Sequence, residues 1–224
     1  MRYQGVFFDF DYTLGDSTGA IAEGYRRGFA AMGQPEPTGE QVRAPGGMRL
    51  EDGYTFITGD SDPGRQAEFH RLFMYSVGVK AQGADRMLMI EGTKLLPGAV
   101  ELLAALKDAG IPAAIVSTKP GETIRRIFTY YGHLDLLALV IGGDEVSRYK
   151  PDPEGVKLAL DRLGLTADRV LFCGDTVIDA ETARAGGCDF CAVLGGTTPR
   201  EAFVDYPHVH IADDLNDLQN WLKL

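Results

Sequence analysis

Cysteine, tryptophan and long apolar runs are scarce in this chain of 224 residues, which contains three cysteines and one tryptophan. So few cysteines exclude a small scaffold held together by disulfides. No apolar run approaches the roughly 20 residues that a membrane-spanning helix needs. The apolar stretch near the start, Val6-Phe7-Phe8, stops at Asp9 and is too short for a secretory signal. We therefore expect a cytoplasmic protein that does not contact a membrane.

Positively charged residues are also few. The chain has 22 lysines and arginines but 32 aspartates and glutamates, so its formal net charge is −10. A nucleic-acid partner is not expected, because its phosphate backbone requires a basic protein surface. A small phosphorylated substrate remains compatible with this charge, since one phosphate needs only a local cation. The oligomeric state is not indicated.

Helical and strand patterns alternate from residue 96 to the end of the chain. Short apolar runs that read as strands cover residues 111–116, 139–141, 170–173, 192–194 and 209–211. Amphipathic helical patterns lie between them, and several end at a glycine. Such alternation predicts parallel strands joined by right-handed helical crossovers. We therefore expect an α/β fold with a Rossmann-like, doubly wound parallel sheet whose strands are covered on both faces.

The segment after the first strand lacks this alternation of helix and strand patterns, and its own pattern indicates helices. Two apolar stripes have helical spacing: Ile21, Tyr25, Phe29 and Met32 in one, and Phe69, Leu72, Phe73 and Val77 in the other. The simplest interpretation is a helical module inserted into the α/β core. The predicted division is a core of residues 1–15 and 93–224 and an inserted helical domain of residues 16–92.

Two aspartates directly follow the first apolar strand, in the motif Asp9-Phe10-Asp11-Tyr12-Thr13. Side chains two apart on an extended segment point the same way, so Asp9 and Asp11 are expected to face one pocket. One carboxylate can then attack an electrophile while the other moves protons. The alternative is an ordinary turn, because Asp and Thr often end strands.

Two later strand ends carry groups that suit an anion. Ser117-Thr118-Lys119 follows one strand, and its hydroxyls and backbone N–H groups resemble an anion cradle, although a helix cap has the same composition. Lys150-Pro151 follows the next strand, and Lys150 is either a solvated surface charge or a cation that neutralises a phosphoryl group.

A fourth strand end contributes two more acids, Asp175 and Asp179, which lie about one helical turn apart. Either alone reads as a helix-capping residue. Gathered with Asp9 and Asp11 at one edge of a sheet, they would repel strongly without a cation. Mg²⁺ relieves such repulsion and accepts carboxylate, water and phosphate ligands, so Mg²⁺ is the expected cofactor.

These four segments resemble the motifs of the haloacid dehalogenase-like phosphohydrolase superfamily, over essentially the whole chain. The resemblance implies that Asp9 is the nucleophile and Asp11 the acid and base. It also implies that Ser117 and Thr118 bind phosphoryl oxygens, that Lys150 offsets charge, and that Thr13 braces the loop. The implied Mg²⁺ ligands are Asp9, the backbone carbonyl of Asp11, Asp175 and, directly or through water, Asp179. Residues 16–92 would correspond to the small cap domain of the family.

Departures from the family pattern refine the expected function. Tyr12 stands where many members have glycine, so the geometry of its loop is open to question. Dehalogenating members usually lack the second acid, and so does the phosphonate-cleaving branch, so Asp11 favours hydrolysis of phosphate esters. The segment Pro45-Gly46-Gly47-Met48-Arg49 resembles a cap loop of phosphoglycolate phosphatase-like members, and Arg49 is either a substrate-reading or a surface residue.

The sequence therefore predicts a Mg²⁺-dependent phosphatase that hydrolyses a small phosphorylated metabolite, resembling phosphoglycolate, through an aspartyl-phosphate. A sugar-phosphate mutase similar to β-phosphoglucomutase, or a pyrophosphatase, is the alternative on the same scaffold. A binding protein without turnover is disfavoured by the intact acid pair and Lys150. The physiological substrate stays open.

Overall fold

The computed structural model describes residues 2–78, 80–81, 87–196 and 198–224. The chain forms two units, a core unit of Met1–Asp16 and Leu95–Leu224 and a helical unit of Ser17–Lys94. Two short strands, β2 (Gly15–Asp16) and β3 (Lys94–Leu95), pair where the chain leaves and re-enters the core unit. Within the described residues, no helix combines the length and the apolar character needed to cross a membrane.

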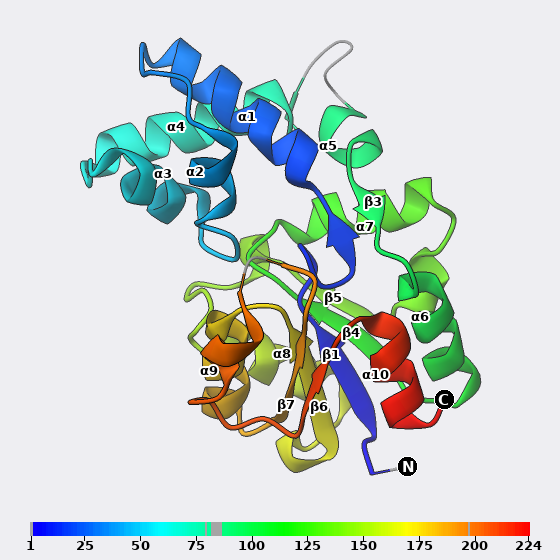
Figure 1. The fold of residues 1–224 in the computed structure, drawn as a ribbon. Helices are drawn as coiled ribbons and strands as arrows, with labels where there is room; N and C mark the ends of the chain where they lie inside the picture. The colour runs from blue at the N-terminus through cyan, green and yellow to red at the C-terminus, as the bar shows by residue number, and fades with distance from the viewer. Residues whose placement is uncertain (1, 79, 82–86, 197) are drawn as a thin grey trace. The chain divides into compact units, whose positions relative to one another are not determined.

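Six parallel strands form the sheet of the core unit, in the order β5-β4-β1-β6-β7-β8 (Figure 1). They are β1 (Gly5–Phe8), β4 (Ala113–Val116), β5 (Leu139–Ile141), β6 (Val170–Gly174), β7 (Asp189–Val193) and β8 (His210–Ala212). Val6, Phe7 and Phe8 of β1 are fully buried, as expected of a central strand that is covered on both faces.

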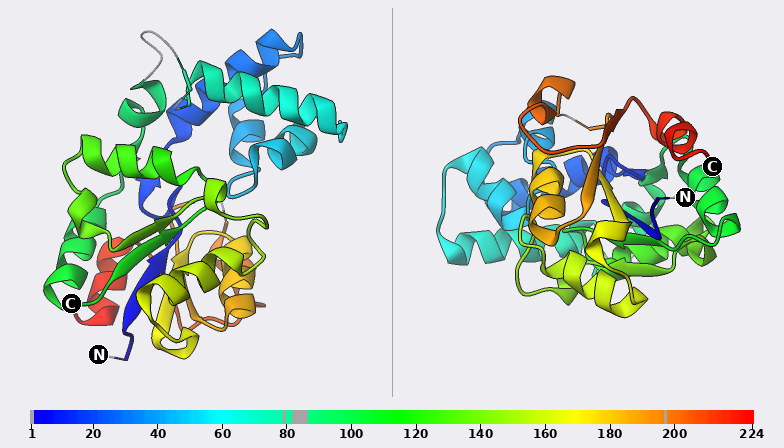
Figure 2. Two further views of the ribbon diagram at one scale, coloured as in Figure 1. Left: turned by 180° about the vertical axis from the view of Figure 1, so that it is seen from behind. Right: turned by 90° about the horizontal axis from the view of Figure 1, so that it is seen from below.

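Helices cover both faces of this sheet (Figure 2). They are α6 (Ala99–Asp108), α7 (Gly121–Tyr130), α8 (Glu154–Leu163), α9 (Val177–Gly186) and α10 (Leu215–Leu222). Helices α8 and α9 pack against each other over Phe7 and Phe172, while α6 and α10 pack together on the opposite face. The predicted Rossmann-like, doubly wound α/β fold is therefore confirmed.

The strand order of the sheet reverses its direction at β1, and this reversal marks the place of the candidate site. Strands β4 and β5 lie on one side of β1, and β6, β7 and β8 lie on the other. Ligands of open α/β sheets bind at the carboxyl ends of the strands, where such a reversal occurs. Phe8 pairs with Ile115 and with Cys173 in register, so the residues that follow β1, β4 and β6 leave the sheet at the same edge.

The helical unit contains no strand among its described residues apart from Lys94 of β3. Its helices are α1 (Thr18–Ala31), α2 (Gly39–Arg43), α3 (Leu50–Thr58), α4 (Pro63–Ser76) and α5 (Leu88–Glu91). Aromatic rings from α1 and α4 form its core, with the centroids of Tyr25 and Phe69 5.0 Å apart and those of Phe29 and Phe69 5.5 Å apart. The two apolar stripes identified in the sequence supply these rings.

Candidate active site

Asp9 is the first residue after β1 and extends its hydrogen bonding, because its N–H donates to the carbonyl of Cys173 at 2.9 Å. This bond holds the backbone of Asp9 at the carboxyl edge of the sheet. The side chain is buried, and its Oδ1 lies 2.8 Å from Nζ of Lys150. The central aspartate and the lysine, which are far apart in the chain, are thus brought together.

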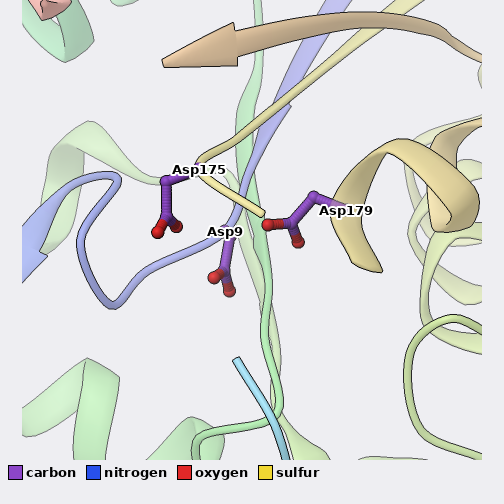
Figure 3. Close-up of side chains that lie close together, drawn as sticks. All are labelled: Asp9, Asp175 and Asp179. Atoms are coloured by element: carbon purple, nitrogen blue, oxygen red, sulfur yellow. The ribbon is translucent and has the colours of Figure 1, made fainter. Parts of the chain in front are cut away.

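Asp175 and Asp179 turn their carboxylates toward Asp9, as Figure 3 shows. One carboxylate oxygen from each of the three residues lies within 4.8 Å of the others, and all three residues are buried. Asp175 follows β6, and its Oδ1 accepts a hydrogen bond of 3.1 Å from the Thr13 hydroxyl. Asp179 lies in the first turn of α9, where it forms a capping box with Thr176. A strand end and a helix start therefore supply the two later acids.

Lys150 is the buried cation of this cluster, with Nζ 2.6 Å from Oδ1 of Asp179 as well as 2.8 Å from Asp9. The cluster contains three carboxyl groups and one ammonium group, and that ammonium group contacts two of the carboxylates. Burial alone would lower the pKa of Lys150, but Asp179 and Asp9 more than compensate and raise it. Burial, together with the neighbouring Asp179 and Asp9, raises the pKa of Asp175 well above its usual range.

The segment that presents Lys150 is anchored by Glu154, in the first turn of α8. The Glu154 carboxylate accepts hydrogen bonds from the backbone N–H groups of Ser147 and Arg148 at 3.0 and 2.9 Å. It also accepts one of 2.8 Å from the Ser147 hydroxyl. These bonds fix the chain immediately before Lys150, so the lysine side chain projects from a defined backbone.

The acidic cluster fits a divalent cation by its own chemistry. Oδ2 of Asp175 is buried and has no hydrogen-bond partner among the residues that the structure describes, although buried polar atoms are nearly always paired. Gly196 lies so close to this oxygen that a Cβ at that position would collide with it, so a small residue preserves the space around it. An unsatisfied carboxylate oxygen among surplus negative charges suits a hard cation such as Mg²⁺, which prefers oxygen ligands.

Asp11 stands apart from this cluster, because its carboxylate pairs with Lys119. The Lys119 Nζ lies 3.2 Å from Oδ1 and 3.1 Å from Oδ2 of Asp11. Ser117 is buried at the end of β4, and its N–H donates to the carbonyl of Ile141. Ser117, Thr118 and Lys150 line one small cavity, so the three predicted phosphate-binding residues lie near one another.

Tyr12 adopts the left-handed backbone conformation, with φ of 63°, at the position where the family pattern has glycine. This conformation costs a residue with a side chain about 1–2 kcal/mol. The loop is tight here, because the Tyr12 N–H donates to the carbonyl of Gly15 at 2.7 Å. The Tyr12 side chain is nevertheless accommodated, since the residue is only 7% exposed. The backbone geometry therefore explains why glycine suits this position.

Arg49 belongs to the helical unit and precedes α3 directly. It follows a tight turn in which the Met48 N–H donates to the carbonyl of Pro45 at 3.0 Å. Its guanidinium lies 3.6 Å from the Glu51 carboxylate, which also contacts His70 at 2.8 Å. The Arg49 side chain keeps 38% of its surface exposed.

The fold and the site together define an α/β protein with a buried acidic centre at the carboxyl ends of its parallel strands. Residues 6–193 match the family model of the haloacid dehalogenase-like hydrolases, and the chain belongs to this family.

Known relatives agree with this assignment. A phosphoglycolate phosphatase from Rhodospirillum rubrum is 34% identical over 59% of this chain, and that alignment spans only 55% of the relative's length. An N-acetylmuramic acid 6-phosphate phosphatase from Pseudomonas aeruginosa is 33% identical, covering 88% of this chain and 84% of the relative. A solved structure from Bacteroides fragilis, assigned to the haloacid dehalogenase-like hydrolases, has a TM-score of 0.89 and 33% identity. It covers 96% of this chain and 99% of that one.

The sequence pattern alone indicates no role for Lys119, and only the structure shows that it contacts Asp11. The lysine lies two residues beyond Ser117, and its Nζ is 5.7 Å from the centre of the Phe10 ring. A lysine directly before Pro120 and the start of α7 was the available signal, but a surface position explains the same pattern equally well.

Proposed function

We propose that this protein is a Mg²⁺-dependent phosphatase that hydrolyses a small phosphorylated metabolite through an aspartyl-phosphate on Asp9. One observation carries the proposal: buried Asp9 lies 2.8 Å from Lys150 beside Asp175, while Asp11 is held separately by Lys119. The two acids therefore have different surroundings, as nucleophilic and proton-transfer roles require. The phosphatase names of relatives support the same reaction class.

In the first proposed step, a carboxylate oxygen of Asp9 bonds to phosphorus while the bond from phosphorus to the ester oxygen breaks. The departing oxygen takes a proton from the Asp11 carboxyl group and leaves as an alcohol. In the second step, water attacks phosphorus and gives a proton to Asp11, and the bond between Asp9 and phosphorus breaks. Phosphate is released, and both aspartates return to their starting states.

Asp9, Asp175 and the backbone carbonyl of Asp11 would hold the magnesium ion, and Asp179 would support it directly or through water. Both carboxylate oxygens of Asp179 already accept hydrogen bonds, from Lys150 and from Thr176. When bound, Mg²⁺ supplies charge neutralisation for the acidic cluster and for a phosphoryl group. Ser117 and Thr118 would donate hydrogen bonds to phosphoryl oxygens, and Lys150 would offset their charge.

A substrate panel tests this proposal. The purified chain with Mg²⁺ should release phosphate from phosphoglycolate or N-acetylmuramic acid 6-phosphate faster than from pyrophosphate, hexose phosphates or nucleotides. A chelator should abolish the release, and added Mg²⁺ should restore it, because surplus carboxylate charge needs the cation.

Other outcomes of the panel would contradict specific parts of the proposal. Isomerisation of a hexose phosphate without release of phosphate would instead identify a mutase, and a preference for pyrophosphate would identify a pyrophosphatase. No turnover across the whole panel would contradict phosphatase activity.

We propose further that Arg49 recognises an anionic group of the substrate other than the transferred phosphoryl group. Both substrates named for the relatives above carry a carboxylate besides their phosphate, and a guanidinium binds a carboxylate through two parallel hydrogen bonds. Arg49→Ala should lower kcat/KM for phosphoglycolate by about 10–100-fold, as expected for loss of one charged hydrogen-bonding group. Turnover of p-nitrophenyl phosphate, which lacks a carboxylate, should change little.

The control for this experiment is Arg43→Ala, which removes an exposed arginine from the neighbouring α2. Arg43→Ala should leave both substrates unaffected. An equal loss on both substrates in Arg49→Ala would remove Arg49 from substrate recognition.

A further inference from the structure

Lys119 is held rigidly by its backbone before its side chain makes any contact. Its N–H donates to the Ser117 hydroxyl at 3.3 Å, and its carbonyl accepts a hydrogen bond of 3.1 Å from Gly143. Gly143 permits this close packing, because a Cβ there would collide with the carbonyl oxygen of Thr118. The loop after β4 is therefore fixed against the segment after β5, and the lysine side chain starts from a fixed point.

The side chain of Lys119 contacts the carboxylate of Asp11. It is 7% exposed, and its Nζ is nearly equidistant from the two oxygens of Asp11, at 3.1 and 3.2 Å. The ammonium group also lies over the ring of Phe10, which is fully buried. Ordering and burying a lysine costs side-chain entropy and solvation. Such a contact between segments 108 residues apart holds the carboxylate in one orientation.

The two buried lysines of the site contact different acidic residues. Lys150 contacts Asp9 and Asp179, which belong to the three-carboxylate cluster, whereas Lys119 contacts Asp11, whose side chain is not part of that cluster. A carboxylate that moves protons must keep one oxygen available to the reacting group. Lys119 can retain one oxygen of Asp11 while the other carries the proton.

We infer that Lys119 is a positioning residue, which orients Asp11 for proton transfer to the leaving group and from the hydrolytic water. This inference rests on the proposed function, because it assigns Lys119 a part in that reaction. Misplacing a reacting group by about 1 Å can lower a rate on the order of 100-fold. The loss should appear only in the steps in which Asp11 gives or takes a proton.

Leaving groups of different basicity isolate those steps. An alkyl phosphate such as phosphoglycolate needs a proton on its departing oxygen, whereas 2,4-dinitrophenolate leaves without one. Lys119→Met should lower kcat/KM for phosphoglycolate by about 30–100-fold and that for 2,4-dinitrophenyl phosphate by no more than about threefold. The hydrolysis of the aspartyl-phosphate also uses Asp11, so kcat for the dinitrophenyl ester should fall and a burst of dinitrophenolate should precede slow turnover.

Two further variants separate orientation from general damage. Lys119→Arg keeps the charge and should recover most of the activity toward phosphoglycolate. Lys107→Met removes a lysine that pairs with Asp135 on the surface, at 2.7 Å, and should behave as wild type. Lys119→Gln provides a second neutral variant should Lys119→Met fail to fold, with circular dichroism and urea unfolding as the checks on folding.

The outcomes distinguish this inference from the proposed function. Equal losses of kcat/KM on both esters, without a burst, would overturn the role of Lys119, because a merely structural or substrate-binding residue affects both substrates alike. Wild-type protein that hydrolyses neither ester would overturn the proposed function itself, and this inference with it. A selective loss on phosphoglycolate together with the burst supports the inference.

Discussion

Asp9→Asn should abolish phosphate release, with kcat at least about 10⁴-fold below wild type, because removal of a nucleophile that acts covalently costs up to about 10⁶-fold in other hydrolases. The amide of asparagine cannot form the carboxylate–phosphorus bond that the proposed first step requires. The fold should persist, since the substitution keeps the size of a buried side chain and removes one of three crowded negative charges. Phosphate release with Mg²⁺ and urea unfolding measure the two effects.

The matched control for this variant is Asp168→Asn, which makes the same chemical change at an exposed position before β6. Asp168→Asn should retain wild-type turnover. Metal-dependent turnover of more than a few per cent in folded Asp9→Asn would refute the nucleophilic role of Asp9.

Lys150→Met should produce the largest loss of stability, lowering the free energy of unfolding by about 3–5 kcal/mol when Mg²⁺ is absent. The lysine is the cation that contacts Asp9 and Asp179, and its removal leaves buried carboxylates without that compensation. Activity should also fall by at least about 100-fold, because a charge aimed at the phosphoryl group is lost. Mg²⁺ should recover part of the stability, since it compensates the same carboxylates.

Urea unfolding with chelator and with Mg²⁺ measures this effect. Lys107→Met serves as the matched control, because its surface pair with Asp135 is exposed to solvent and should leave the unfolding midpoint unchanged. If Lys150→Met were as stable as wild type in chelator, the ion pairs of Lys150 with Asp9 and Asp179 would contribute no net stability, and the expected loss would be refuted.

The strand ends that form the site could be recognised from the sequence alone. Alternating patterns after residue 96 predicted parallel strands, and parallel strands bring their carboxyl ends to one edge. That rule was sufficient to expect Asp9, Lys150 and Asp175 together, and the structure places them together. Asp9 and Asp175 follow apolar strands directly, so their positions depend on local pattern, whereas Lys150 lies nine residues beyond the end of β5.

Tertiary structure decided which charges pair with one another. The sequence does not show which lysine each acid contacts, whereas in the structure Lys150 contacts Asp9 and Lys119 contacts Asp11. Tertiary structure also decided the left-handed backbone conformation of Tyr12, which residues other than glycine rarely adopt.

The sequence by itself determined the α/β class and the edge of the sheet at which the acids gather. Both can be read from the pattern of apolar and polar residues within each short segment of the chain. The partner of each acid was decided by strand register and by close backbone packing, such as that of Gly143 on the loop before Lys119. Those contacts join segments 108 residues apart for Asp11 and Lys119 and 162 residues apart for Asp175 and Thr13, and no pattern within a single segment predicts them.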